Sequence, residues 1–260
     1  MVKIFIDPGH GGGDSGAVGN GLLEKNLTLQ ISRVIRDLLL QYENVSVQMS
    51  REGDQTLTLN QRTNMANAWG ADFVLSVHIN AGGGTGYEDF RHSNQAASSV
   101  SGRIQWEIHA AVMTSLSSFR VADRGVKTAN FHMLRESDSP AVLTENLFID
   151  NATDANLLKQ SEVITAIAVG HVQGIVSFYN LQGKPNTFTP EEDDLMAQPF
   201  NPTTPTIRNS VATVLARFEQ KDPALARQWR EQFLNGQLTI SDAIGLLYVA
   251  IERGYIEGNE

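Results

Sequence analysis

Short apolar runs alternate with stripes of apolar residues at helical spacing through the first part of the chain. Val2–Ile6 and Phe73–Val77 are predominantly apolar runs typical of buried strands, and Val142–Leu143 begins another. Val45–Met49 alternates apolar and polar residues, as a strand with one solvated face does. Apolar residues at helical spacing predict helices at Leu27–Leu39 and Asp154–Leu181, and Leu59–Trp69 and Ile104–Leu116 also read as helices. This alternation predicts an α/β fold in which helices pack on a mostly parallel sheet.

The composition changes at residues 182–206. Five of the chain's eight prolines lie there, together with the acidic run Glu191–Asp194. A segment rich in proline and acidic residues is typical of a linker. We therefore expect one domain at residues 1–181, a linker at 182–206 and a second domain at 207–260.

The last segment has the spacing of short helices. Ile207–Phe218 carries an apolar stripe, and Pro223 suits the first turn of a second helix. Thr239–Asp242 resembles a capping box with aspartate in place of glutamate, and Gly254 would end the third helix, which that box opens. The pattern predicts a small all-helical domain.

Composition narrows the class of protein. The net charge of −9 argues against non-specific nucleic-acid binding, because that binding needs a basic surface to displace phosphate counterions. The chain has no cysteine, which excludes disulfides and thiolate metal sites and favours His, Asp and Glu as metal ligands. The apolar fraction of 41% is ordinary for a soluble protein with one good core.

The N-terminus lacks the pattern of a secretory signal. The apolar run Val2–Ile6 is too short, and no cleavage site follows it. We also find no stretch that we expect to cross a bilayer. The sequence therefore predicts a protein that is made in the cytoplasm, without a signal peptide and without a membrane span.

Residues able to bind a metal follow two of the predicted strands and open one helix. His10 lies among glycines directly after the first strand, and His78 follows Phe73–Val77. Glu24 falls in the first turn of its helix, where the helix dipole favours a carboxylate. Sites in α/β sheets form beyond the carboxyl ends of strands, so we expect these residues at one edge. Two histidines and a glutamate form a ligand set that holds zinc and leaves one coordination position free for water.

A further carboxylate, Glu145, comes from the end of another apolar run, Pro140–Thr144. Zinc on the three ligands would polarise a scissile carbonyl and lower the pKa of a bound water. Glu145 could then accept the water proton and pass it to the leaving nitrogen. The residues together predict amide hydrolysis without a covalent intermediate.

At these residues the chain resembles the zinc-dependent N-acetylmuramoyl-L-alanine amidases of the Amidase_3 type. The motifs that carry the resemblance are IDPGHGG with His10, LLEKNLTLQI with Glu24, SVHINA with His78 and LTEN with Glu145. The segments MSREGD, LNQRTNMAN and RGVKTANFHMLRES are also similar to family segments. The resemblance covers roughly residues 1–180 and is nearest to the spore-former cell-lysis amidases and the phage endolysins.

The resemblance implies a mixed sheet of about six strands flanked by helices, with Zn²⁺ on His10, Glu24 and His78 and with Glu145 as the catalytic carboxylate. The implied substrate is bacterial peptidoglycan, cut between N-acetylmuramic acid and the L-alanine of the stem peptide. Such a hydrolase degrades the cell wall as an endolysin or autolysin. One departure is Leu147, because relatives commonly have glycine there, and we expect the local packing to differ.

Other polar residues near these motifs have candidate roles. Asn80 is a candidate for orienting substrate, although asparagine after a strand is as often a turn residue. Asn130 is a second substrate-binding candidate, because its segment should border the cleft. Asp7 fits a hydrogen-bond acceptor behind the ligands better than a fourth ligand. For Arg62 and Arg51 we favour pairing with internal carboxylates over substrate contact.

Two other functions use the same residues. A zinc peptidase or a deacetylase would hydrolyse another amide with this ligand set, and a wall-binding module would carry an inactive site. Product analysis separates the enzymes, since an amidase releases free L-alanine amino groups without loss of acetate. An intact Glu145 beside three ligands argues against the inactive module.

The second domain leaves its role open. Its apolar stripes fit a small core, a surface that binds the wall, or a surface for self-association. Residues 186–260 hold 6 Lys and Arg against 11 Asp and Glu, which argues against a purely electrostatic wall anchor. The missing export signal suits release through a holin-type pore of a phage, or action after lysis of the producing cell.

Overall fold

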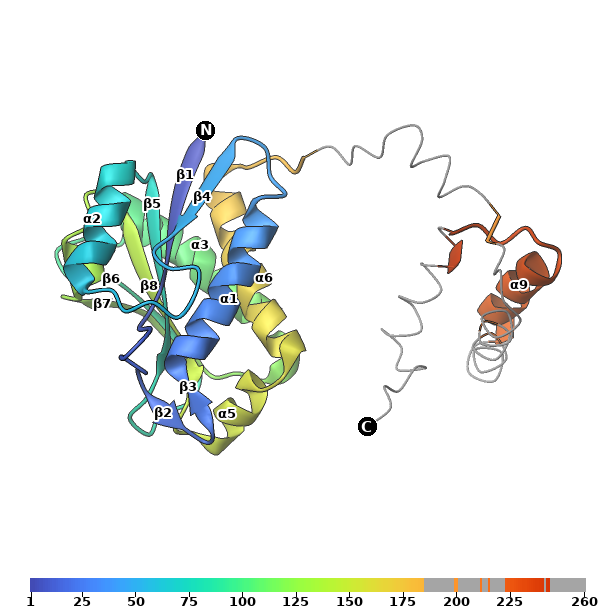
Figure 1. Cartoon of the computed structure of the whole chain (residues 1–260), viewed down its shortest axis with the longest axis horizontal. Coiled ribbons are helices and arrows are strands. Elements are labelled where there is room, and N and C mark those ends of the chain that lie inside the picture. Colours follow the sequence, from blue (N-terminus) through green and yellow to red (C-terminus); the bar gives the residue numbers. More distant parts are fainter. Residues whose placement is uncertain (185–198, 201–210, 212–214, 216–222, 241, 244–260) are drawn as a thin grey trace. The chain divides into compact units, whose positions relative to one another are not determined.

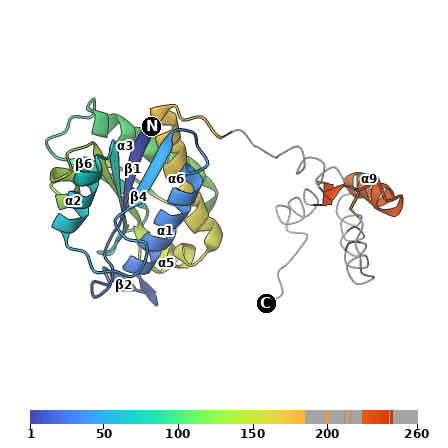
Figure 2. The same ribbon diagram turned by 45° about the horizontal axis from the view of Figure 1, so that its top comes forward.

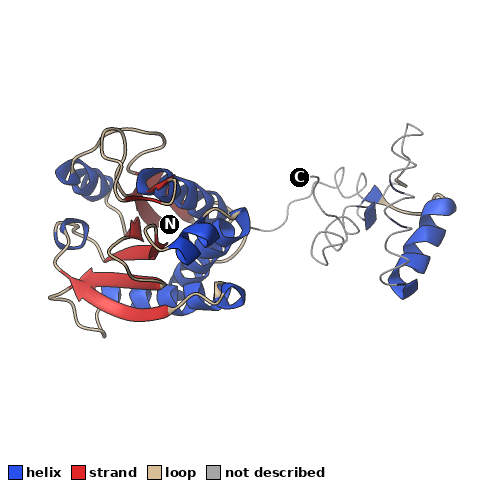
Figure 3. Cartoon of the chain, turned by 90° about the horizontal axis from the view of Figure 1, so that it is seen from below, coloured by secondary structure: helices blue, strands red, loops and turns tan. Residues whose placement is uncertain are grey.

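The computed structural model of the chain describes residues 1–184, 199–200, 211, 215, 223–240 and 242–243, and Figure 3 marks the others in grey. The chain divides into two units, residues 1–184 and residues 185–260.

The first unit is built on a six-stranded sheet with the order β4-β1-β5-β8-β6-β7 (Figure 1). Its four parallel members β4, β1, β5 and β8 are Val45–Met49, Val2–Pro8, Phe73–Asn80 and Ala141–Phe148. β6 (Tyr87–His92) is antiparallel to β8, and β7 (Asp123–Ala129) is parallel to β6. A separate short hairpin pairs β2 (Val18–Gly19) with β3 (Leu22–Leu23). The sheet is therefore mixed and mostly parallel, as expected.

Helices cover both faces of this sheet. α1 (Glu24–Leu39), α3 (Val100–Ser115) and α6 (Ser161–Tyr179) pack together on one face, and α1 and α6 lie side by side in both Figure 1 and Figure 2. α2 (Leu59–Trp69) and the short α4 (His132–Arg135) pack on the other face. Short segments α5 (Ala152–Leu158) and η1 (Ser117–Phe119) complete the described helices of this unit. The result is a three-layer α/β sandwich.

The alternation along β5 explains why one face of the sheet becomes polar. Phe73, Leu75, Val77 and Ile79 enter the main core under α1, α3 and α6. The residues between them point to the other face, where Val74 joins the smaller core under α2 and α4. Further along this face come Ser76, His78 and Asn80. The apolar part of this face thus gives way to polar side chains towards the carboxyl end of the strand.

Local hydrogen bonds determine where several helices start. Thr58 and Gln61 form a reciprocal capping box at the start of α2, and Gly70 ends that helix in the left-handed conformation. The Ser99 side chain accepts from Gly102 N–H at the start of α3, and Asn151 caps α5 in the same manner. These polar residues account for the helix boundaries that an apolar stripe alone does not define.

The structure confirms most of the predicted elements and corrects several. Val45–Met49 and Leu59–Trp69 are a strand and a helix with the predicted bounds. His78 and Glu145 lie inside β5 and β8 instead of after them, because both strands continue further than their apolar runs. The single helix predicted at Asp154–Leu181 is two helices, α5 and α6, because Gln160 takes an extended conformation between them.

Helix α6 corrects the expectation that no stretch is suited to crossing a bilayer. By length and composition alone it would qualify, with a mean hydropathy of 1.3. Its residues Ile164, Ile167, Ala168 and Ile175 are buried in the main core instead. The apolar composition of α6 is therefore explained by its central place between α1 and α3.

The second unit contributes one complete helix to the described residues, α9 (Pro223–Leu234), which starts at the predicted proline. The predicted capping box is also present: Thr239 N–H donates to Asp242 Oδ2 over 3.0 Å, and Asp242 N–H donates to Thr239 Oγ1 over 3.0 Å. Apart from residues 211 and 215, the predicted helix at 207–218 lies outside the described residues, as do most of the linker and the end at Gly254.

Candidate active site

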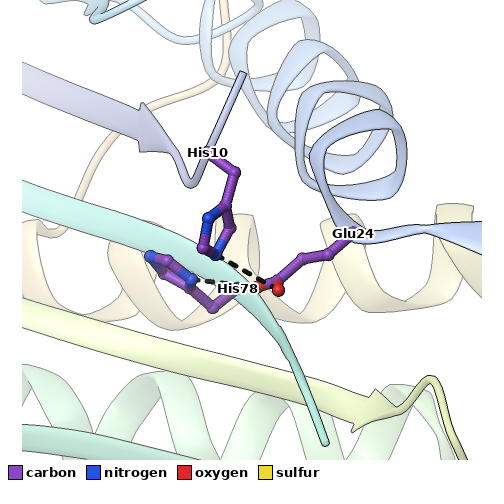
Figure 4. Close-up of side chains that lie close together, drawn as sticks. All are labelled: His10, Glu24 and His78. Atoms are coloured by element: carbon purple, nitrogen blue, oxygen red, sulfur yellow. Dashed lines mark hydrogen bonds and ion pairs between the residues drawn. The ribbon is translucent and has the colours of Figure 1, made fainter. Parts of the chain in front are cut away.

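Three predicted metal ligands meet at the carboxyl edge of the sheet (Figure 4). His10 follows β1, Glu24 begins α1 and His78 lies near the end of β5. Nε2 of His10 is 3.1 Å from Oε2 of Glu24, and Nδ1 of His78 is 3.0 Å from Oε1. The candidate ligand atoms all lie within 4.8 Å of one another, so one ion could contact all of them.

Two glycines make room for this close approach. A Cβ at Gly9 would lie 2.4 Å from Cε1 of the His78 ring. A Cβ at Gly16 would lie 2.5 Å from Oε2 of Glu24, and the φ of +63° at Gly16 is itself one that favours glycine. The glycines of this region are therefore required by the packing of the ligands themselves.

The carboxylate of Glu24 is held ionised between the two rings. Burial opposes ionisation, but the hydrogen bonds with His10 and His78 more than offset it and hold the pKa of Glu24 below its ordinary value. Backbone N–H groups of Ala17 and Ile79 also donate to its oxygens over 2.8 and 3.0 Å. Despite its own burial, His10 has its pKa raised to about 9, mainly by Glu24 and then by Asp14.

This donor set fits zinc chemically. Two imidazoles and one carboxylate are borderline and hard donors of the type that zinc accepts, and three protein ligands leave a further position open. Nδ1 of His10 is also 2.8 Å from Oδ2 of Asp14, an outer contact of the kind that fixes the orientation of a metal-binding ring. The site therefore has both the ligands and an orienting partner that a zinc centre needs.

Two buried arginines hold the loop that carries His10. Arg62 donates through Nη1 to Asp7 Oδ1 over 2.8 Å and through Nη2 to the carbonyl of His10 over 2.6 Å. Arg51 donates to the carbonyls of Pro8 and Gly9 over 3.0 and 2.9 Å. The prediction that Arg62 pairs with an internal carboxylate is confirmed, whereas Arg51 bonds backbone carbonyls and no carboxylate among the described residues.

Asp7 is not one of the three clustered ligand residues. It is buried and accepts hydrogen bonds from Ser50 over 2.6 Å and Ser76 over 3.0 Å, in addition to Arg62. None of these contacts reaches a ligand ring. Asp7 supports the site through the arginine that holds the His10 loop.

Glu145 is placed beside the ligands by strand register. It pairs with His78 across β5 and β8, so the two side chains lie on the same face. Its Oε2 is buried and has no hydrogen-bond partner. Burial raises the pKa of Glu145 to about 7, and the carboxylates of Glu24 and Glu88 act in the same direction. An unpaired carboxylate that titrates near neutrality is suited to accepting and returning a proton.

The residue two positions after Glu145 has an unusual backbone. Leu147 has a φ of +68° and is completely buried. The register between β5 and β8 shifts at this point, because Asn80 pairs with Phe148. A leucine in the left-handed region is strained by its Cβ, which gives a physical reason why glycine suits this position.

The two substrate-binding candidates, Asn80 and Asn130, lie near opposite ends of the strands of the sheet. Asn80 is near the ligands and donates through Nδ2 to Glu88 Oε1 over 2.8 Å. Asn130 follows β7, which runs opposite to β8, and its Oδ1 is 3.0 Å from Nε2 of His92 at the end of β6. The structure therefore does not bring Asn130 to the ligands.

Sequence inspection missed two residues of the site. Asp14, which contacts His10, is four residues further along the chain in a glycine-rich turn, and no periodic pattern singles it out. Glu88 pairs directly with Glu145 across β6 and β8. β6 (YEDFRH) is too polar for an apolar-run criterion, so neither the strand nor Glu88 was predicted.

Residues 4–177 match a family model described as N-acetylmuramoyl-L-alanine amidase. The chain is 54% identical over 182 residues to the N-acetylmuramoyl-L-alanine amidase CwlM of Bacillus licheniformis, covering 70% of each chain. It is 41% identical over 192 residues to the endolysin of Bacillus phage SPP1, covering 74% of this chain and 71% of the endolysin.

Solved structures show the same architecture. The N-acetylmuramoyl-L-alanine amidase of Clostridium difficile 630 superposes with a TM-score of 0.66 at 30% identity, over 69% of this chain and 97% of that one. The catalytic domain of CwlV from Bacillus (Paenibacillus) polymyxa var. colistinus gives a TM-score of 0.64 at 29% identity, over 69% and 99% of the two chains.

Proposed function

The chain belongs to the N-acetylmuramoyl-L-alanine amidase family and acts as a peptidoglycan amidase, and we propose that it does so with zinc held by His10, Glu24 and His78 and with Glu145 as general base. The observation that carries this proposal is the register pairing of Glu145 with His78, which places an unpaired carboxylate beside the ligand cluster. The bond cleaved is the amide between N-acetylmuramic acid and the L-alanine of the stem peptide. A peptidase or deacetylase function is not favoured by the family match.

When bound, zinc would polarise the scissile carbonyl and acidify a water molecule. The protein residues would accept and donate the proton. Glu145 accepts a proton from the attacking water, and the same oxygen then donates it to the amide nitrogen as the bond to L-alanine breaks. Burial acts to raise the pKa of Glu145, which favours a carboxyl group that can take up the proton and return it to the leaving nitrogen. Asp14 and the two arginines would hold His10 in position throughout.

The place of action would be the bacterial cell wall. Relatives of this chain carry the names of a bacterial amidase and of a phage endolysin. Release through a phage pore and release by lysis of the producing cell both remain consistent with that pair of relatives.

The test compares the wild-type chain with Glu145→Gln on purified peptidoglycan, with bound metal quantified in both. We expect wild type to release L-alanine amino termini and to carry about one zinc per chain. Glu145→Gln should retain zinc and lose about 10²- to 10⁴-fold in kcat, the usual contribution of a general base. His78→Ala, a matched loss of a ligand, should lose both zinc and activity.

Release of acetate in place of amino termini would refute the amidase reaction. Wild-type activity in a metal-free protein would refute the role of zinc. A Glu145→Gln variant with unaltered kcat would refute the role of Glu145 and leave the other two assignments standing.

A further inference from the structure

Two cations lie beside the proposed catalytic carboxylate and are not used by the mechanism above. Arg124 and Lys127 of β7 both reach Oε2 of Glu88 on the neighbouring β6. Burial opposes ionisation of Glu88, but these two cations lower its pKa, so the carboxylate is charged and holds both of them in place. One carboxylate shared by two cations leaves this cluster with an excess positive charge.

The cluster is next to the reaction centre. Glu88 pairs with Glu145 across β6 and β8, so both side chains point to the same face of the sheet. β7 lies two strands from β8, and the cationic groups of Arg124 and Lys127 reach back to Glu88 on the strand next to Glu145. The ligands lie on the other side of Glu145, on β5, in the loop after β1 and at the start of α1. The polar edge therefore runs from the ligands through Glu145 to the cations.

Arg124 is oriented and still has donors available. Its Nε bonds Glu88, and its guanidinium lies 4.8 Å from the centre of the Phe148 ring. Its two terminal nitrogens make no hydrogen bond to the residues that the structure describes. The side chains of Arg124 and Lys127 are 34% and 36% exposed, so both can be reached by a ligand. A guanidinium with a free pair of N–H groups is suited to binding a carboxylate.

We propose that Arg124 and Lys127 form a subsite for a carboxylate of the stem peptide, close to the L-alanine side of the scissile amide. This inference rests on the proposed amidase function. The sugar next to the scissile bond offers neutral hydroxyl and acetamido groups, whereas the stem peptide carries free carboxylates. An extended peptide advances about 3.5 Å per residue, so a carboxylate on the second residue of the stem falls within reach of these cations.

The subsite would make the enzyme prefer cell walls whose stem peptides carry a free carboxylate at the second residue. A stem peptide whose second residue has a free carboxylate would gain charge-assisted hydrogen bonds from the subsite. A stem peptide that carries a carboxamide at the same position would present a neutral group and bind more weakly. Arg124 and Lys127 would then determine specificity without taking part in bond cleavage.

The experiment uses two soluble muramoyl peptides that differ only in a carboxylate or carboxamide at the second residue. We expect the wild-type chain to show a KM about tenfold or more lower for the carboxylate form, with similar kcat for both. Arg124→Gln and Lys127→Gln should each reduce this ratio towards one, mainly through KM. Arg124→Lys should keep part of the preference, and the matched control Lys159→Gln should leave the ratio as in wild type.

Binding of the two peptides to Glu145→Gln, measured by calorimetry, gives a readout that does not depend on turnover. Tighter binding of the carboxylate form, lost in the Arg124→Gln/Glu145→Gln chain, would support the subsite even if the amidase assignment failed. Equal binding of both peptides, or an unaltered preference in folded Arg124→Gln and Lys127→Gln chains, would overturn the subsite. Failure to cleave either peptide would count against the proposed function instead.

Discussion

The close packing around the proposed zinc ligands restricts which residues can stand next to them. Gly9 lies against the His78 ring, with only 2.4 Å between Cε1 and the position that a Cβ would occupy. We expect Gly9→Ala to displace His78 and to weaken zinc binding by about tenfold or more, a loss of the size seen when contacts supporting a ligand are removed. Zinc titration against a competing chelator measures this effect.

Gly13→Ala is the matched control, because no atom lies within 4 Å of a Cβ at that position. It should bind zinc as the wild type does. Equal zinc affinity of the two alanine variants would show that the approach of His78 to Gly9 has no bearing on metal binding.

Because Leu147 has a left-handed backbone conformation, we expect its glycine variant to be more stable than its alanine variant, the reverse of the order at an ordinary strand residue. Loss of a buried leucine side chain costs about 2–5 kcal/mol, and the left-handed conformation of a non-glycine residue costs about 1–2 kcal/mol. Leu147→Gly loses the side chain but also the strain, whereas Leu147→Ala keeps the strain. We therefore expect the unfolding free energy to fall in the order wild type, Leu147→Gly, Leu147→Ala. Denaturant titration checks this order, and an alanine variant more stable than the glycine variant would contradict it.

At the scale of single elements, α6 and β8 are joined by a buried histidine. Nε2 of His171 is 3.1 Å from Oγ1 of Thr144, and its Nδ1 is 2.7 Å from the carbonyl oxygen of Ile167. Burial lowers the pKa of His171 to about 4 from 6.5. The unfolded chain therefore binds this proton more readily, and the neutral imidazole stabilises the fold fully above pH 6.5.

As the pH falls from 6.5 to 4, this contribution should be lost, by an amount on the order of 3 kcal/mol. His171→Gln removes the titrating group, so the pH dependence of its unfolding free energy should be shallower than that of wild type over this interval. Chemical denaturation at several pH values measures both slopes. Parallel slopes would show that His171 does not titrate with unfolding.

Sequence patterns predicted the bounds of some elements correctly. Val45–Met49 and Leu59–Trp69 have the bounds that the structure confirms, although the strand is only partly buried up to Met49 and Leu59 is exposed. The strands β6 and β7 were not predicted. β6 holds the charged residues Glu88, Asp89 and Arg91 within six residues, so it has no apolar run. Asp89 is buried in β6 because His109 and Gln105 on α3 contact it over 2.8 Å each, and such long-range pairing leaves no periodic signal.

The same limit applies to the site. His10, His78 and Glu145 were predicted as site residues from motifs at the ends of apolar runs and Glu24 from its place at a helix start, and the structure places these four residues near one another. Asn130 was misplaced because nothing in its own segment reveals that β6 and β7 run opposite to β8. The direction of a strand in a sheet depends on its neighbours, and those are distant along the chain.

At the scale of the whole molecule, residues 1–184 contain every residue of the proposed mechanism and form a unit of their own. We propose that residues 207–260 bind the cell wall and thereby raise the local concentration of the catalytic unit on an insoluble substrate. A chain ending at residue 184 should therefore cleave soluble muramoyl peptides as the full chain does. On intact walls it should be slower by about tenfold or more.

Turnover of both substrates by both chains, with sedimentation to record their oligomeric states, makes the comparison. Equal rates on intact walls would remove wall binding as the role of the second unit. A full chain that is dimeric where the shorter chain is monomeric would indicate self-association instead.

The place of Arg124 and Lys127 on β7 has a further consequence for solubility. Among the described strands β7 has one neighbour, β6, so its outer backbone groups form an open border of the sheet. Positive side chains and a bulge on such a border discourage a strand of another molecule from adding to it, and the β6–β7 register is irregular beside Tyr87. These cations would therefore also protect the protein from edge-to-edge aggregation. An apolar residue in place of Arg124 or Lys127 would make the open border of β7 prone to aggregation. Replacement of either residue by another charged residue would change the stem-peptide preference without that cost.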